Sequence, residues 1–271
     1  MHKFLKLFPD SLKCPVIGMI HIPALPGTPR QSSFPITLDA VRKEAEIYKN
    51  LPIDAVMIEN MHDIPYVRNP GPEIISSVTR VACEVRNILR NIPIGIQILA
   101  CGNREALAVA KATGCQFIRA EGFVFSHVAD EGFVDACAGD LMRFRRQIDA
   151  EDVAILTDIK KKHSSHAITQ DLSLLEAAQA AEFFLSDGII VTGTATGDPV
   201  ATQDLDSISG RINIPTIIGS GVTSGNLEEY FDKCQGMIVG SHFKKSGKWS
   251  DPLCPERIGQ FMGIIKKLRN L

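Results

Sequence analysis

Apolar residues in this chain occur in two kinds of segment, which alternate from residue 15 onward. Short runs rich in valine and isoleucine are typical of buried strands, and they are separated by longer segments with apolar residues at helical spacing. This alternation is typical of β/α units around a parallel sheet. Eight strands are expected, at 16–22, 55–60, 93–100, 116–123, the start of 154–166, 188–193, 215–222 and 236–243.

A helix is expected after each strand. Thr37 and Asn103 are expected N-caps, and Pro255 is expected to begin the last helix, where the first turn tolerates proline. A long insertion, 123–139, precedes the helix that follows the fourth strand. The helices are expected at 37–50, 73–90, 104–114, 141–148, 173–184, 201–208, 226–231 and from 255 onward.

Eight strands that alternate with eight helices predict an α/β fold, a single (β/α)8 or TIM barrel, because closure removes both sheet edges. A doubly wound open sheet would call for G-x-G-x-x-G after the first strand, where this chain has HIPALPG. No linker or change in composition divides the chain. We therefore expect one domain, 1–271, with an N-terminal extension at 1–14 and the barrel at 15–271.

The composition is that of an ordinary globular protein, with 271 residues, 45% hydrophobic and 22% charged. A net charge of -2 gives no sign of binding to nucleic acid or to a membrane surface. Seven scattered cysteines without a C-x-x-C pair indicate a reducing compartment. The cytoplasm is expected, and the short basic, amphipathic start of the chain leaves the mitochondrial matrix open.

Polar residues recur near the ends of the predicted strands, where a barrel of this kind has its active site. A ring of polar groups there indicates mutual pairing or ligand contact, because unpaired buried polar groups are costly. Ile58, Ile96, Ile190, Ile217 and Ile238 are expected to lie under the helices. The alternate, inward positions are His21, Glu59, Gln97, Arg119, Glu121, Asp158, Lys160, Thr192, Ser220 and Ser241.

Asp158 and Lys160 are two residues apart in the fifth strand and are expected to share a face. The pair is either a structural ion pair or part of a catalytic site. In the second case Lys160 serves as acid/base or as a Schiff-base nucleophile. Glu59 and Glu121 are the expected carboxylate partners, and His21 or His163 the proton carrier.

The loops after the last two strands, GSGVTSGN and VGSHFKKSG, are rich in small residues. Glycines let backbone N–H groups approach an anion, and this end of a barrel is the usual phosphate site. Alternatively the glycines only make tight turns. The expected phosphate-binding residues are Gly219, Ser220, Gly221, Gly240 and Ser241, with Arg119 and Lys244 assisting.

The stretch VTGTATGDP follows the sixth strand. Thr192, Gly193, Thr194 and Asp198 are candidates for binding sugar hydroxyls, although Asp198 could equally cap a helix. No cofactor is indicated. A divalent metal ion is left open. No ligand spacing such as H-E-x-x-H occurs, but potential ligands are present: His21, Glu59, Asp63, Glu121, Asp158 and His163.

Seven stretches of the chain carry a resemblance to a known family: GMIHIPALPGTP, AVMIEN, FIRAEGFVFSHVADEG, DIKKKHSSH, VTGTATGDP, IGSGVTSGN and GSHFKKSGKWSDPLCPERIGQFM. They resemble motifs of the BtpA family, barrel proteins named for a member linked to photosystem I biogenesis. The resemblance covers nearly the whole chain and implies a barrel close to the ribulose-phosphate-binding barrels. Ala120 and Glu121 replace an asparagine-containing stretch of bacterial members, which resembles a eukaryotic-type variant.

DIKKKH is also similar to the D-x-K-x-x-D of orotidine-phosphate decarboxylase-like barrels, but with histidine last. That similarity is an analogy only. The polar strand ends and the glycine-rich loops lead us to expect an isomerase, lyase or aldolase acting on a small phosphorylated metabolite, a sugar or nucleotide-like molecule. The alternatives are a non-catalytic ligand-binding or assembly factor and a metal-dependent hydrolase of nucleosides or phosphate esters. Leu174, Phe183 and Phe184 either form a homo-oligomer surface or face the barrel.

Overall fold

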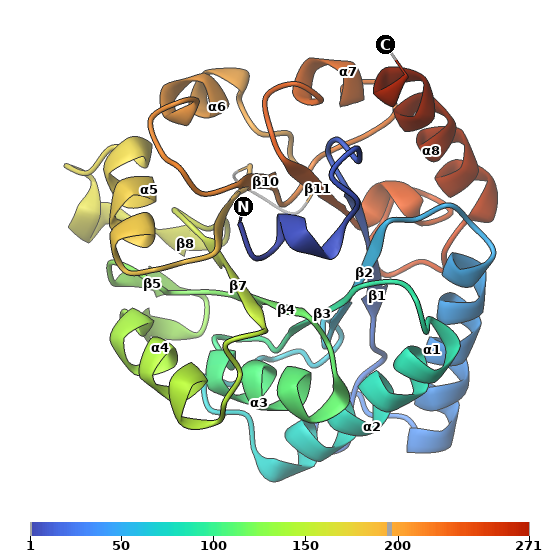
Figure 1. The fold of residues 1–271 in the computed structure, drawn as a ribbon. Helices are drawn as coiled ribbons and strands as arrows, with labels where there is room; N and C mark the ends of the chain where they lie inside the picture. The colour runs from blue at the N-terminus through green and yellow to red at the C-terminus, as the bar shows by residue number, and fades with distance from the viewer. Residues whose placement is uncertain (1, 194–196, 271) are drawn as a thin grey trace.

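The computed structural model describes residues 2–193 and 197–270, and its centre is a closed barrel. Within these ranges eight parallel strands pair in the order β1-β11-β10-β9-β7-β4-β3-β2, with helices around the ring (Figure 1). The predicted (β/α)8 barrel is confirmed. The strands are β1 (Val16–His21), β2 (Ala55–Glu59), β3 (Ile94–Gln97), β4 (Phe117–Ala120), β7 (Ala154–Asp158), β9 (Gly188–Val191), β10 (Thr216–Ile218) and β11 (Gly236–Val239).

A helix follows each barrel strand, as expected. Pro255 opens the last helix, and Ser173 with Glu176 forms a capping box at the start of α5. The α-helices in the described residues are α1 (Phe34–Lys49), α2 (Pro72–Ile88), α3 (Asn103–Thr113), α4 (Ala138–Gln147), α5 (Leu174–Phe183), α6 (Thr202–Ile208), α7 (Leu227–Tyr230) and α8 (Pro255–Arg269).

Two of the expected N-caps are wrong. Helix α1 begins at Phe34 after Ser33, so Thr37 is a buried residue inside its first turn. Asn103 is the first residue of α3, and its side chain is bonded elsewhere. Asn103 Nδ2 donates to the carbonyl of Glu121 at 2.6 Å, and Asn103 Oδ1 accepts from the Glu121 N–H at 3.1 Å. This residue therefore holds the end of β4 rather than capping its helix.

The barrel interior is filled by apolar side chains from alternate strand positions. Ile58 and Ile96 belong to the core between strands and helices, as expected. The outward assignment of Ile190, Ile217 and Ile238 is wrong, because all three lie in the inner cluster with Met57 and other inward residues. Bulky residues are needed there to fill the barrel. Consequently Gly219 and Gly240, two positions further along, continue the inward face at the carboxyl end.

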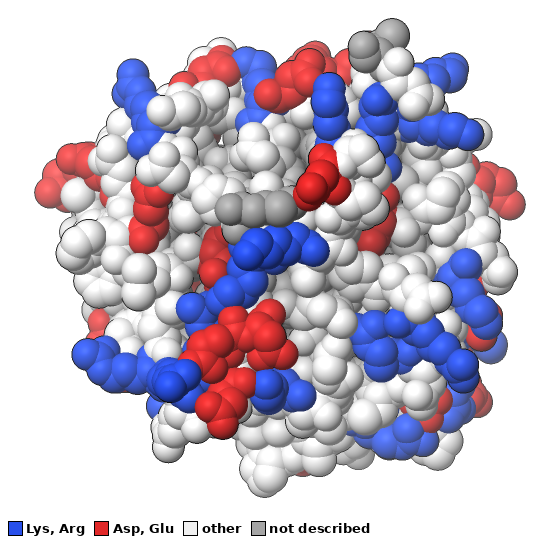
Figure 2. Space-filling model, in the orientation of Figure 1, with Lys and Arg blue, Asp and Glu red and all other residues white. Residues whose placement is uncertain are grey.

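The N-terminal segment closes the opposite end of the barrel. The 3-10 helix η1 (Leu5–Leu7) lies across this end, at the centre of Figure 1. Phe4 and Phe8 belong to the inner apolar cluster, and the ring of Phe4 contacts that of Phe117 edge-on at 5.6 Å. On this face acidic and basic side chains are intermingled (Figure 2). Residues 1–14, expected as an extension, thus include part of the core.

The insertion after β4 forms a small sheet outside the barrel. Strands β5 (His127–Ala129) and β6 (Gly132–Val134) make a hairpin, and β8 (Ser164–Ser165) pairs with β5 on its other edge. Since β8 comes soon after β7, this pairing draws the chain away from the barrel axis directly after Asp158. The 3-10 helix η2 (Ala167–Thr169) follows.

Part of the expected outer apolar surface is present. Phe183 is 79% exposed and Phe184 46%, whereas Leu174 packs against the core between strands and helices. Among the described residues, no helix has the length and apolar character needed to cross a membrane.

Candidate active site

A cavity of about 400 Å³ lies at the carboxyl ends of the barrel strands. It is lined by strand ends from one half of the barrel and by the loops after β10 and β11 from the other. The predicted site residues that line it are His21, Glu59, Arg119, Glu121, His163, Gly219, Ser220, Gly221, Gly240 and Ser241. Asp158, Lys160, Thr192, Gly193 and Asp198 lie behind or beside it. Thr194 lies outside the described residues.

His21 and Glu59, at the ends of the paired strands β1 and β2, face each other in the cavity. The carbonyl of Trp249 can only accept, so the Nδ1 atom of His21 donates to it at 3.0 Å. His21 Nε2 then faces Glu59 Oε2 at 3.5 Å. Burial, with help from Lys244, lowers the pKa of His21 to about 3, and burial raises the pKa of Glu59 to about 7. The pair is therefore a neutral imidazole beside a partly protonated carboxyl, not an ion pair.

Gln97 stands next to Glu59 in the barrel register and lines the same cavity. It is 2% exposed, and its Oε1 atom has no hydrogen-bond partner among the described residues. A buried carbonyl oxygen without a partner is costly. An occupant of the cavity that presents a hydroxyl or N–H group to Gln97 would remove this cost.

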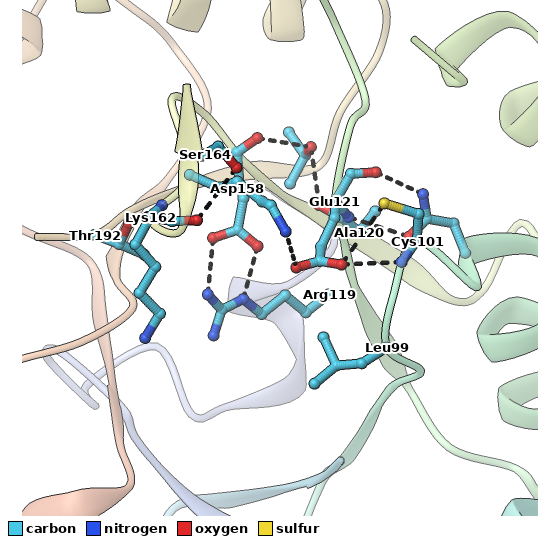
Figure 3. Close-up of polar contacts among 12 residues, drawn as sticks. Leu99, Cys101, Arg119, Ala120, Glu121, Asp158, Lys162, Ser164 and Thr192 are labelled. Atoms are coloured by element: carbon cyan, nitrogen blue, oxygen red, sulfur yellow. Dashed lines mark hydrogen bonds and ion pairs between the residues drawn. The ribbon is translucent and has the colours of Figure 1, made fainter. Parts of the chain in front are cut away.

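Arg119 and Asp158 form a bidentate ion pair across β4 and β7. Arg119 Nε and Nη2 each donate to one carboxylate oxygen of Asp158 at 2.8 Å (Figure 3). Burial opposes the charge of Arg119, but Asp158 outweighs it and raises the pKa of Arg119. The expected pairing of Asp158 with Lys160 is wrong, because the carboxylate is occupied by the guanidinium. Arg119, whose charge stays fixed, is the member of the pair that lines the cavity.

The Glu121 carboxylate is held by two neighbours. Its Oε1 atom accepts from Lys161 Nζ at 2.9 Å, and its Oε2 atom accepts from the Cys101 N–H at 2.9 Å (Figure 3). Burial alone would raise the pKa of Glu121, but the Lys161 ammonium outweighs burial and lowers it. The same pair raises the pKa of Lys161 against the effect of burial. Burial raises the pKa of the Cys101 thiol to about 12, so this cysteine stays protonated at neutral pH.

Lys160 does not point into the cavity, so its predicted orientation is wrong. Strand β7 ends at Asp158, and the backbone at Lys160 takes a positive φ of 44°. The alternation of side chains ends with the strand. Lys160 Nζ donates to the carbonyl of Leu172, and the residue lines a separate small cavity toward the outer sheet.

Lys162 enters the cavity instead. Its backbone N–H donates to Thr192 Oγ1 at 3.3 Å, and its side chain extends beside Arg119 (Figure 3). Among the described residues no carboxylate or other acceptor pairs with its ammonium, whereas Lys161 has Glu121. Burial first, and then the charge of Arg119, lower the pKa of Lys162 to about 8. This lysine is therefore partly unprotonated near neutral pH.

The loops after β10 and β11 supply the small residues expected of an anion site. Gly221 has a φ of +74°, and a Cβ there would lie 2.1 Å from the Asp198 carbonyl oxygen, so a tight turn explains it. Gly240 has an ordinary φ of -106°, and its nearest neighbour would be 3.4 Å from a Cβ. A tight turn therefore explains the glycine at 221 but not the glycine at 240. At Gly240 the absence of a side chain leaves the backbone open toward the cavity.

Thr192, Gly193 and Asp198 support the site from behind. Thr192 positions Lys162, and the Gly193 N–H donates to Ser220 Oγ at 3.2 Å. Ser220 Oγ in turn donates to the carbonyl of Asp198 at 3.3 Å. Helix α6 has Ala201 at its N-cap, so Asp198 is not the cap of this helix.

Lys244 is not in the anion site, contrary to expectation. It is 1% exposed and its Nζ atom donates to Glu44 Oε1 of helix α1 at 2.6 Å. His163 lies on the rim of the cavity. Within residues 2–193 and 197–270, no group of three or more His, Cys, Asp or Glu side chains has a metal-binding arrangement.

Sequence reasoning missed several lining residues. Lys161 and Lys162 belong to the run of three lysines from which only Lys160 was selected. Trp249 and Tyr66, from loops, add an aromatic wall. The run of lysines directly after a strand was a usable signal, whereas no local pattern marks a loop residue such as Trp249.

The family model described as the BtpA family matches residues 12–267. The chain belongs to the BtpA family. A Caenorhabditis elegans protein, described as uncharacterized and mitochondrial, is 49% identical over 94% of each chain. The photosystem I biogenesis protein BtpA of Synechocystis is 30% identical over 92% of this chain and 86% of its own. The greater similarity to the C. elegans protein confirms a eukaryotic-type BtpA member.

Solved structures resemble this chain in fold. Phosphoribosyl anthranilate isomerase from Thermus thermophilus aligns with a TM-score of 0.56 and 12% identity, over 94% of this chain and 99% of its own. At this identity the likeness concerns the barrel alone. It agrees with the expected TIM barrel.

Proposed function

We propose that this BtpA-family protein is an enzyme that acts on a phosphorylated sugar or nucleotide-like small molecule, by isomerase, lyase or aldolase chemistry. One observation carries the proposal. A single cavity is lined by the glycine- and serine-containing ends of β10 and β11 and by two titratable groups, Glu59 and Lys162, whose pKa values are displaced toward neutrality. Its volume of about 400 Å³ suits a small metabolite.

The phosphate would lie against the loops after β10 and β11. Gly219, Gly221 and Gly240 bring backbone close to the cavity, with Ser241 as a hydroxyl donor. The Ser220 hydroxyl already donates to the Asp198 carbonyl, so this residue contributes its position in the loop. A Cβ on Gly219 would lie 3.5 Å from Arg119 Nη2, so this loop adjoins a buried positive charge. Backbone N–H groups with a nearby guanidinium are suited to a phosphate.

The chemistry would be carried out at the opposite wall. Glu59 and Lys162 are close enough for each to influence the other's charge, and neither has a strong ion-pair partner among the described residues. General acid and base catalysis works best when the pKa lies near the working pH. Lys162 therefore takes the role first assigned to Lys160, with Glu59 as its acid/base partner. A pure binding cavity has no need of such a pair.

Binding can be tested with the single tryptophan of the chain, Trp249, which lines the cavity. Inorganic phosphate and ribose 5-phosphate are titrated against its fluorescence. In Gly240→Ala the added methyl would meet its nearest neighbours, Met19 and His21, at 3.4 Å or more. It would occupy the approach to the anion, so Kd should rise about tenfold, or ~1.4 kcal/mol. The matched control is Gly263→Ala, in the exposed face of α8, where a Cβ meets nothing within 4 Å.

Catalysis can be tested by hydrogen exchange, because these reaction types remove a proton from carbon. Dihydroxyacetone phosphate and ribulose 5-phosphate are incubated with the protein in D2O, and loss of C–H signal is followed by NMR. Lys162→Met and Glu59→Gln should slow the exchange by roughly 100-fold or more. The proposal is overturned if phosphates give no saturable response, or if the two variants exchange as fast as the native protein.

A further inference from the structure

The three lysines that follow β7 differ in what their ammonium groups contact. Lys160 Nζ donates to the Leu172 carbonyl outside the cavity, and Lys161 Nζ is paired with Glu121 at 2.9 Å. Lys162 lines the cavity and has no partner for its ammonium in the described part of the chain. Only this lysine is thus available to a molecule in the cavity.

The surroundings of Lys162 favour its neutral form. The neighbouring Arg119 keeps its charge, because Asp158 pairs with it at two 2.8 Å hydrogen bonds. A second positive charge beside this fixed, buried one is unfavourable. A lysine next to another cation in a partly dry site is an effective nucleophile toward carbonyl groups. The backbone is held as well, since Thr192 Oγ1 accepts from the Lys162 N–H.

We propose that the substrate of this site is a phosphorylated aldehyde or ketone, and that Lys162 binds it covalently as a Schiff base while its phosphate lies against the loops after β10 and β11. This inference rests on the proposed function and narrows its substrate class to carbonyl compounds.

The step balances without an oxidant or a second substrate. The Lys162 Nζ lone pair forms a bond to the carbonyl carbon, and the carbonyl π electrons move to oxygen, which takes a proton from Glu59. The nitrogen then loses a proton to the Glu59 carboxylate. The hydroxyl group takes this proton back from Glu59 and leaves as water while the nitrogen lone pair forms the C=N bond, so Glu59 ends as a carboxylate beside the protonated Schiff base. The resulting cation withdraws electrons from the adjacent carbon, which is what isomerases, lyases and aldolases require.

The experiment uses glycolaldehyde phosphate as the probe, because it is a small molecule with one aldehyde and one phosphate. The full-length protein is incubated with the probe and sodium borohydride, which delivers hydride to the iminium carbon and leaves a stable secondary amine. Intact mass should rise by the mass of the probe less one oxygen, once per chain. Peptide mapping should locate the adduct on Lys162.

Lys162→Met should lose the adduct, whereas the control Lys160→Met, altered outside the cavity, should keep it. Inorganic phosphate should protect Lys162 from the probe. The initial rate should pass through a maximum between pH 7 and pH 8, because the step uses neutral Lys162, whose pKa is lowered to about 8, and protonated Glu59, whose pKa is raised to about 7. Labelling of a surface lysine should instead keep rising toward pH 10. Circular dichroism checks that each variant is folded.

The inference is wrong if labelling is spread over surface lysines and is unchanged in folded Lys162→Met, or if no adduct forms. If phosphate and ribose 5-phosphate still change Trp249 fluorescence although no Lys162 adduct forms, the proposed phosphate site stands and only the covalent step is wrong. When both the fluorescence response and the adduct are absent, the proposed function fails with it.

Discussion

Glu59 is predicted to destabilise the folded protein at alkaline pH, and replacement by glutamine should remove the cost. The carboxyl is 7% exposed and faces a neutral His21 at 3.5 Å. Its pKa rises from 4.5 to about 7, because burial penalises the charged form. Glutamine has the size of protonated glutamate and carries no charge. Glu59→Gln therefore keeps the shape of the site while removing the titration.

The magnitude follows from linkage between protonation and folding. The unfolded chain releases the Glu59 proton near pH 4.5, whereas the folded protein holds it up to about pH 7. Stability from the protonated form is fully present below pH 4.5 and is lost as the pH rises to 7. At ~1.4 kcal/mol per pKa unit, ionised Glu59 costs roughly 3 kcal/mol at pH 8 and less than about 1 kcal/mol at pH 5.

The assay is urea unfolding of the native protein and of Glu59→Gln at pH 5 and pH 8. Titration of other groups is common to both proteins and cancels in the difference. The free energy of unfolding of the variant minus that of the native protein should be about 2 to 3 kcal/mol larger at pH 8 than at pH 5.

Glu121→Gln is a control with the opposite sign. The pKa of Glu121 is lowered because Lys161 outweighs burial, so its ionised form stabilises the fold above its unfolded pKa. The variant leaves a buried ammonium without its carboxylate and should lose about 3 to 5 kcal/mol at pH 8. If Glu59→Gln and the native protein differ by the same amount at both pH values, the buried, proton-holding state assigned to Glu59 is incorrect.

Three further predictions concern the fold. Phe4→Ala should lower the free energy of unfolding by about 3 to 5 kcal/mol in urea, because Phe4 is fully buried, whereas Phe183→Ala, at a 79% exposed site, should stay within about 0.5 kcal/mol; equal effects would contradict the plugged barrel end. Asp158→Asn should lower the free energy of unfolding by about 3 to 5 kcal/mol, because it leaves the buried Arg119 guanidinium without its carboxylate partner. An unaltered urea midpoint would argue against that ion pair. Gly263→Ala should raise Tm by a few degrees through helix propensity of about 0.5 to 1 kcal/mol, and a fall in Tm would contradict its open surroundings.

The positions of the strands could be predicted from sequence because strand formation depends on local composition. Runs such as VIGMIHI and AVMIEN are β-branched and apolar, and each is a buried strand. Side-chain alternation also placed His21, Glu59 and Arg119 at the inner face, because it holds wherever the backbone is extended. The choice of glycine loops after the last two strands depended on the same fold rule, and the residues do line the cavity.

The failures begin where the strands end. Lys160 lies two residues beyond the end of β7 and has a φ of 44°. The alternation of strand side chains therefore no longer predicts the direction of its side chain. After this turn β8 pairs with β5, a segment about 36 residues earlier in sequence, and local pattern carries no information on such contacts. The ion-pair partner of Asp158 was equally hidden from local pattern. Its carboxylate binds Arg119, which comes from β4, and not Lys160, which is two residues away in sequence.

The sequence by itself therefore determined the barrel, the end at which the cavity lies and most of the residue types around it. Only the tertiary structure decided which of three adjacent lysines lines the cavity without an ion-pair partner among the described residues, and which carboxylates are already paired. Extended backbone and apolar runs are properties of neighbouring residues, so the sequence carries them directly. Protonation and reactivity depend on burial and on charges brought from other strands, as at Lys162 and Glu59, and these exist only once the barrel has closed.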